Sequence, residues 1–137
     1  MSYENPWLHN GSIFDSEGIK EYYGFVYLIV NKLTNKKYIG KKFFFSTKRK
    51  QVNKKRKRIL VESDWKNYYG SNSELVSDVQ EHGKDNFSRE ILHLCSTKGL
   101  CNYYEAKEQF QVDCLRRNDY YNTWIQVKVH KKHLKGL

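Results

Sequence analysis

The stretch "GFVYLIVNKLTNKKYIGKK", residues 24–42, sets the beginning of the fold. Residues 24–31 are rich in Val, Ile and aromatic side chains and contain no breaker, which is typical of a buried strand. The polar turn "KLTNKK" separates this run from "KKYIGKKFFF", so the two runs predict an antiparallel hairpin. Gly40 inside the second run indicates a bulge or a close approach of another group to the backbone. Tyr27 and Tyr38 then lie on facing strands, where both side chains can point to one side of the sheet.

Further along the chain, helical and extended patterns alternate. Residues 73–83 show apolar side chains at helical spacing, with Ser73 as the expected N-cap and a terminal glycine. Residues 86–95 alternate and predict a third strand, and residues 102–117 predict a second helix. The order of strands and helices favours an α+β fold in which helices cover a small sheet.

Charge is distributed unevenly along the 137 residues, whose formal net charge is +10. Residues 41–58 hold ten Lys and Arg and no Asp or Glu, and residues 127–137 are basic as well. Like charges in one segment repel each other, so this run favours a polyanionic partner over a solvated face that only maintains solubility. The secondary structure of residues 46–60 stays open between a helix, a loop and a mixture of both.

Several classes of protein are disfavoured by what the sequence contains. No apolar run approaches 18 residues, so we expect no membrane partner. The three cysteines include no CxxC pair, which fits free thiols in a reducing cytoplasm. The pair His130 and His133 matches no standard finger, so no zinc is expected. No GxxxxGK[ST], HExxH or GxSxG occurs, which removes support for nucleotide, zinc-protease and serine-hydrolase chemistry.

The chain length and the single proline indicate one domain with short extensions. We expect an N-terminal arm over residues 1–22, a domain over 23–126 with a basic insertion at about 46–70, and a basic C-terminal tail over 127–137.

Two short motifs resemble a known family. The sequence "GFVY" at residues 24–27 and "YIG" at 38–40 are similar to the two halves of the motif of the GIY-YIG nucleases, and eleven positions separate the two tyrosines. The first half is longer by one residue, as in some family members. The helix-then-strand segment "ELVSDVQEHGKDNFSREIL" resembles the homing-endonuclease-like branch, and the chain as a whole resembles the short stand-alone members of phage genomes. The resemblance implies a small three-stranded antiparallel sheet flanked by helices and a metal-dependent DNA endonuclease.

The resemblance also implies site residues. Glu105, on the helix after the third strand, matches the family's glutamate, and Asn122, seventeen residues later, matches its asparagine. Lys41 resembles the lysine that often follows the YIG. The family arginine is expected at Arg49, with Arg56 and Arg58 as alternatives because this chain carries an insertion here.

These residue types suit phosphodiester hydrolysis. Glu105 can hold one Mg²⁺, with Mn²⁺ as a substitute, while waters fill the other positions. Arg49 can pair with the phosphate as a bidentate fork. Tyr27 and Tyr38 are assigned to water activation together, without a choice of base, and Lys41 is placed to lower a tyrosine pKa from its usual value near 10.

DNA is the expected partner, bound in the bacterial host cytoplasm if the chain is phage-encoded. Specificity is expected from the insertion, from a homodimer or from a partner protein, and "DWKNYYGSN" is a candidate segment for further substrate contact. Two alternatives stay open: a non-catalytic DNA- or RNA-binding module of the same fold, and a basic RNA-binding protein in which the motif is coincidental. The residues expected to contact nucleic acid are Lys42, Lys48, Lys50, Lys54, Lys55, Arg56, Lys57, Arg58 and Lys66.

Overall fold

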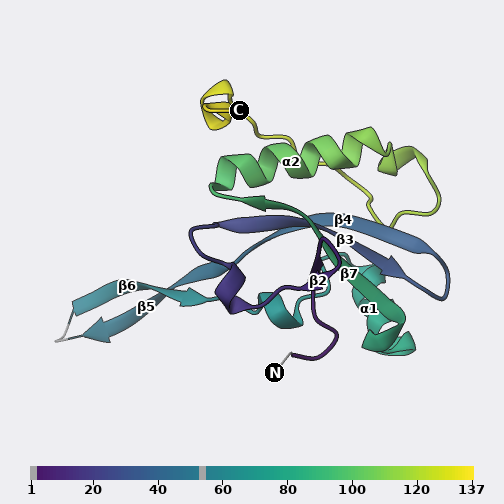
Figure 1. Cartoon of the computed structure of the whole chain (residues 1–137), viewed down its shortest axis with the longest axis horizontal. Coiled ribbons are helices and arrows are strands. Elements are labelled where there is room, and N and C mark those ends of the chain that lie inside the picture. The colour runs from purple at the N-terminus through teal and green to yellow at the C-terminus, as the bar shows by residue number, and fades with distance from the viewer. Residues whose placement is uncertain (1–2, 53–54) are drawn as a thin grey trace.

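The computed structural model describes residues 3–52 and 55–137, with only the backbone described for Lys50, Val52 and Lys57. Its main body is a sheet with one helix on each face, and a separate two-stranded hairpin projects from it (Figure 1). The strands are β1 (Leu8–His9), β2 (Ser12–Ile13), β3 (Gly24–Asn31), β4 (Lys36–Phe43), β5 (Phe45–Val52), β6 (Lys55–Glu62) and β7 (Phe87–Cys95), and the helices are α1 (Ser73–His82) and α2 (Lys98–Gln111).

The sheet has the order β2-β1-β7-β3-β4. Strand β3 pairs antiparallel with both β4 and β7, which gives the expected three-stranded antiparallel unit. The α+β class is confirmed. The prediction of three strands is wrong for the complete sheet, which has five, because β1 adds to β7 in parallel and β2 pairs with β1. Two-residue strands are too short to produce a recognisable alternation, so only their tertiary pairing reveals them.

The N-terminal segment, which the sequence suggested to be an arm, packs into the core. Trp7, Phe14 and Ile19 are buried there. The indole Nε1 of Trp7 donates a hydrogen bond to the carbonyl of Trp65, at 2.7 Å. This segment therefore contributes directly to the core on the face of the sheet that α1 covers.

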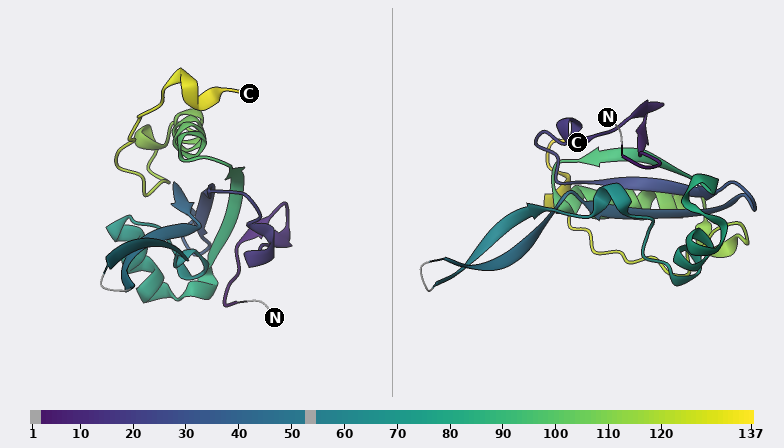
Figure 2. Two further views of the ribbon diagram at one scale, coloured as in Figure 1. Left: turned by 90° about the vertical axis from the view of Figure 1, so that its left-hand side faces the viewer. Right: turned by 90° about the horizontal axis from the view of Figure 1, so that it is seen from below.

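The two faces of the sheet carry different cores. Phe25, Tyr27 and Ile29 of β3 pack with α1 residues such as Leu75, whereas Val26 packs with α2 on the other face. This division follows from the alternation of side chains along a strand. Figure 2 shows α1 and α2 on opposite sides of the sheet. No helix in the described ranges has both the length and the apolar character needed to cross a lipid bilayer.

Helix α2 begins and ends earlier than residues 102–117. Thr97 caps its start, since its Oγ1 accepts a hydrogen bond from the Leu100 amide at 3.1 Å. The left-handed conformation of Asp113, with φ of 56°, follows its last turn. The helix therefore ends before Arg116 and Arg117, which were expected at its C-terminal dipole.

The basic run forms a β-hairpin, not the helix, loop or mixture that its sequence suggested. Strands β5 and β6 pair in continuous register from Phe45 opposite Glu62 to Val52 opposite Lys55. A helix here would bring like charges together at i, i+4 spacing with no acidic residue to offset them, which disfavours it. The hairpin extends away from the main body (Figure 2).

Candidate active site at the edge of the sheet

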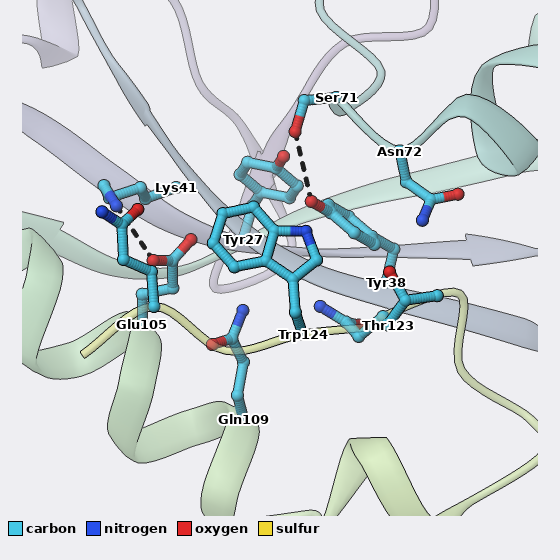
Figure 3. A pocket seen from close by; sticks show the side chains of 11 residues that line it. Tyr27, Tyr38, Lys41, Ser71, Asn72, Glu105, Gln109, Thr123 and Trp124 are labelled. Atoms are coloured by element: carbon cyan, nitrogen blue, oxygen red, sulfur yellow. Dashed lines mark hydrogen bonds and ion pairs between the residues drawn. The ribbon is translucent and has the colours of Figure 1, made fainter.

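A cavity of about 410 Å³ opens beside β4, the edge strand of the sheet (Figure 3). Five of the six residues that the sequence assigned to catalysis line it: Tyr27, Tyr38, Lys41, Glu105 and Asn122. They come from β3, β4, α2 and the segment after α2, so the fold gathers residues that lie far apart in the sequence.

The register of β3 and β4 explains why both tyrosines face the same side. Tyr27 pairs with Gly40, and Ile29 pairs with Tyr38, so the two tyrosines are diagonal neighbours on the α1 face. Their ring centroids lie 6.2 Å apart. Lys41, the next residue along β4, points to the α2 face instead. The cavity therefore receives side chains from both faces, around the β4 edge of the sheet.

Gly40 makes room for this arrangement. A Cβ atom at this position would lie 2.5 Å from the hydroxyl oxygen of Tyr27 and 2.9 Å from Cε2 of Tyr38. Tyr27 is only 1% exposed, so its ring has little room to move away. The close approach that the glycine predicted is confirmed. Because Gly40 lacks a side chain, the hydroxyl of an inner-strand tyrosine can reach across β4 to the edge.

On the α2 face, Glu105 and Lys41 form an ion pair. The Lys41 ammonium lies 3.0 Å from Oε1 of Glu105, whose side chain is 12% exposed. This pairing places the carboxylate at the sheet edge, beside the glycine over which Tyr27 lies.

Gln109, one helical turn after Glu105, has an unused acceptor. Its Nε2 donates to the Ile39 carbonyl at 2.9 Å. A carbonyl can only accept, so this bond fixes the orientation of the amide. The buried Oε1 then has no hydrogen-bond partner among the described residues. A buried acceptor without a donor is costly, so this atom is poised to receive one from a ligand or a bound water.

Asn122 holds the edge strand in place. Its Oδ1 accepts from the Ile39 amide at 3.1 Å, and its Nδ2 donates to the Ile39 carbonyl at 2.8 Å. Just before it, Tyr120 forms a parallel bridge with Lys37. The side-chain amide thus continues the pairing of the β4 edge where the backbone bridge stops. Asn122 acts here as a positioning residue for the YIG segment.

We expect Asn122→Ala to destabilise the protein by about 1–3 kcal/mol, because the Ile39 amide loses its buried acceptor. Urea unfolding monitored by tryptophan fluorescence measures this change. The exposed neighbour variant Thr123→Ala is the control and should stay within about 0.5 kcal/mol of the wild type. Equal stability of both variants would remove the positioning role.

Burial keeps both site tyrosines protonated. It raises the pKa of Tyr27 well above its usual value, and the nearby Tyr68 and Tyr38 hydroxyls add to the effect. Burial also raises the pKa of Tyr38, although a hydrogen bond with Ser71, at 3.3 Å, opposes it. At neutral pH both phenols are therefore hydrogen-bond donors. A role as general base, which stays a prediction, requires positive charge brought in with the substrate or a metal.

The raised pKa of Tyr27 predicts a loss of stability in alkali. Above pH 10 the unfolded chain ionises this tyrosine while the folded protein keeps it protonated, so the free energy of unfolding falls as the pH rises. The contribution of one such group approaches about 1.4 kcal/mol per pH unit. Urea unfolding between pH 8 and 11 should show a shallower fall for Tyr27→Phe than for the wild type. The variant Tyr23→Phe, at an exposed ring, is the matched control, and identical slopes for all three proteins would contradict the prediction.

Arg49 does not join the cavity. It lies on β5, directly opposite Arg58 on β6, and Arg56 lies on β6 as well. The described residues that line the cavity include no arginine, and Lys41 is the cation beside Glu105. A helix, one of the alternatives that the sequence left open here, would have kept an arginine close to the YIG, whereas the hairpin carries all three arginines away from the body.

The other predicted nucleic-acid contacts divide into two groups. Lys42 pairs with Asp64 at 2.7 Å and lies over the Tyr68 ring, while Lys66 lies near the rings of Trp65 and Tyr3. These lysines have partners on the main body. The remaining ones belong to the hairpin segment, where Lys54 and the side chains of Lys50 and Lys57 lie outside the described residues.

Sequence reasoning missed Gln109, Thr123, Trp124 and Gln126 as lining residues. One feature of the sequence could have indicated Gln109: it lies one helical turn after Glu105, on the same face of the predicted helix. Ser71 and Asn72 belong to "DWKNYYGSN", so this segment does reach the cavity, and its contact with substrate stays a prediction.

Comparison with known protein families fits this geometry. Residues 7–125 match the family described as "Putative endonuclease segE, GIY-YIG domain". The chain belongs to the GIY-YIG nuclease family. The resemblance drawn from the two tyrosine motifs is thereby confirmed, and the GIY-YIG match begins at Trp7, inside the segment that packs behind the sheet. No curated protein and no solved structure matches the chain.

GIY-YIG nucleases generally use divalent metals, and the residues that the structure describes offer oxygen ligands in at least two places. In the described part of the chain, the group of three close His, Cys, Asp or Glu ligands is Asp78, Glu81 and His82 on α1. Glu105 stands apart from that group as a single carboxylate. The free Oε1 of Gln109 on the same helix supplies a second oxygen at the edge cavity.

Proposed function

We propose that this GIY-YIG protein is a metal-dependent endonuclease that hydrolyses phosphodiester bonds of double-stranded DNA in the edge cavity. The observation that carries the proposal is the convergence of Tyr27, Tyr38, Lys41 and Glu105 in one cavity. An ammonium group and two phenol donors can bind a phosphate, and a carboxylate can hold the metal ion that polarises it.

The donors near Glu105 suit a hard cation such as Mg²⁺, with Mn²⁺ as a substitute. The carboxylate of Glu105 would hold it, and the free Oε1 of Gln109 would accept a hydrogen bond from its hydration shell, since Mg²⁺ usually keeps several waters. When bound, the ion supplies Lewis acidity at the phosphate. The described residues that line the cavity include no His or Cys, the nitrogen and sulfur ligands that zinc favours.

The remaining residues orient the phosphate and the attacking water. Lys41 holds the Glu105 carboxylate in place and adds positive charge where the substrate phosphate enters. The protonated hydroxyls of Tyr27 and Tyr38 donate hydrogen bonds, either to a non-bridging oxygen or to the water. Activation of that water by one of the tyrosines remains part of the proposal. Asn122 acts indirectly, through the strand that carries the YIG.

Affinity in this proposal comes largely from the basic hairpin and the basic C-terminal tail. Phosphate contacts release counterions, so binding should weaken steeply with salt. The protein would act on DNA in a bacterial cytoplasm, as a phage-encoded enzyme, either as a homodimer or with a partner that adds specificity.

Incubation with supercoiled plasmid and Mg²⁺ tests the proposal. We expect nicking or linearisation by the wild type and a strong decrease for both Glu105→Ala and Tyr27→Phe. Gel shift of the uncut plasmid at 50 and 200 mM salt measures binding separately. If all three proteins shift the plasmid and none cuts it with Mg²⁺ or Mn²⁺, the protein is a binding module of this fold and the enzyme proposal fails.

A further inference from the structure

The hairpin formed by β5 and β6 has two chemically different faces. Directly opposed residues of an antiparallel pair share a face, and the register pairs Arg49 with Arg58 and Gln51 with Arg56. These four exposed side chains therefore lie on one face, which we call the arginine face. On the other face, the described basic side chains are the lysines Lys48 and Lys55.

The arginine face is poorly explained by stability alone. Like charges directly opposite each other, as at Arg49 and Arg58, destabilise a strand pair. No ion pair joins Arg49, Arg56 or Arg58 to a described acidic residue. An isolated two-stranded hairpin is already only marginally stable in water. A polyanionic partner would offset this repulsion, because it neutralises all three guanidinium groups at once.

The residue types on this face correspond to base recognition. Arg forms bidentate hydrogen bonds to O6 and N7 of guanine, and Gln forms them to N6 and N7 of adenine. A two-stranded ribbon fits the major groove of B-form DNA, whereas the major groove of A-form RNA is too deep and narrow for side chains to read. Lysine is a flexible point charge that suits phosphate and lacks the planar fork with which arginine grips O6 and N7 of guanine together.

The attachment of the hairpin fixes its position relative to the cavity. Strand β4 leads into it through Phe44, which is fully buried, and the Ser63 amide donates to the Phe44 carbonyl at 2.7 Å where the hairpin returns. Trp65, also fully buried, follows. With eight residues in each strand, the ribbon is about 25 Å long. A base contacted by the arginine face would therefore lie within about one helical turn of the cavity.

We propose that the β5–β6 hairpin enters the major groove of duplex DNA and reads base edges with Arg49, Gln51, Arg56 and Arg58, while Lys48 and Lys55 contact flanking phosphates. The hairpin thus sets the sequence preference at a fixed distance from the cut. This inference rests on the proposed function in taking DNA as the substrate.

Selection from a random duplex pool tests the face assignment. Each protein carries Glu105→Ala so that bound DNA stays uncut, and bound duplexes are sequenced. The parent should prefer guanine at particular positions about tenfold or more. The triple variant Arg49→Lys, Arg56→Lys, Arg58→Lys keeps the charge and loses the bidentate fork, so it should lose the preference and retain the affinity for mixed sequence.

The matched control lies on the opposite face of the same hairpin. Lys48→Gln with Lys55→Gln should keep the guanine preference and reduce the slope of log affinity against log salt by about 2, since each phosphate contact contributes about 0.9. Because all five side chains are exposed, both variants should fold, and circular dichroism with thermal melting checks this. Single Arg49→Lys and Arg58→Lys variants, each with a partial loss of preference, repeat the test with smaller changes.

Modified bases identify the groove. Replacing guanine by 7-deazaguanine removes N7 in the major groove, and replacing it by inosine removes the amino group in the minor groove. We expect the preference to disappear with the first and persist with the second. The opposite pattern, or equal affinity for an RNA duplex, would overturn the assignment.

Failure of this inference can be told apart from failure of the nuclease proposal. If the Glu105-intact protein cuts plasmid but the arginine variants leave both the selected motif and the sequenced cut sites unchanged, the hairpin does not read DNA and the nuclease proposal stands. If an arginine-dependent motif emerges and no metal supports cutting, the hairpin inference stands and the enzyme proposal falls. A parent protein that selects no motif also overturns the inference.

Discussion

Glu105→Gln should lower the cleavage rate by roughly a thousandfold and leave DNA binding nearly unchanged. Glutamine has nearly the same size as glutamate but lacks the negative charge that Lys41 now contacts at 3.0 Å and that a divalent metal requires. Loss of the charge stabilisation supplied by a metal is worth several kcal/mol, and about 4 kcal/mol corresponds to this factor. Single-turnover nicking of supercoiled plasmid measures the rate.

Glu108→Gln is the matched control for that experiment. Glu108 lies on the same helix, three residues further along, and its carboxylate pairs with His93 at 2.8 Å. It does not line the cavity. We expect its cleavage rate to stay within a few-fold of the wild type. Comparable losses from both variants would show that the helix tolerates neither change and that Glu105 has no special role.

Gly40→Ala should destabilise the protein by about 1–3 kcal/mol, through overpacking, and should reduce cleavage by about a hundredfold. The new methyl group would meet the Tyr27 hydroxyl at 2.5 Å. Tyr27 cannot retreat easily, because Trp7 and Phe25 pack around its ring. The hydroxyl must therefore shift relative to Glu105, and a displacement of about 1 Å is enough for such a loss of rate.

A double-mutant cycle separates this steric effect from any general effect of alanine in β4. In a Tyr27→Leu background the side chain is too short to reach Gly40, so the stability cost of Gly40→Ala should shrink markedly. Urea unfolding of the four proteins gives the coupling free energy. A cost that stays the same in both backgrounds would mean that the clash with Tyr27 is not its cause.

The central part of the fold is predictable from the sequence because each element has a burial pattern of its own. The buried run of β3, the alternation of β7 and the apolar spacing of α1 all reflect which faces are covered. The convergence of Tyr27, Tyr38 and Glu105 follows once the family resemblance supplies the order of elements. These residues sit on regular elements, whose geometry restricts where a side chain can point.

The rest depends on contacts between distant parts of the chain. Both faces of the described hairpin are largely exposed and charged, so β5 and β6 show no alternation of apolar and polar residues that would predict a strand. The pairing of β1 depends on β7, some eighty residues later. Gln109 gains its role from the Ile39 carbonyl, 70 positions earlier. Local patterns carry no information about such partners.

The two ends of the hairpin lie next to each other on the main body, so the segment can be exchanged without a change in the rest of the fold. The hydrogen bond from Ser63 to Phe44 joins the two ends of the insertion, so the chain leaves the main body and returns to it at one point. Changes in the length of such a segment cost little, with each doubling of a loop adding only about 0.6 kcal/mol. Under the proposed base readout, exchange of this segment alone would give the protein a new target sequence and leave the cavity residues unchanged.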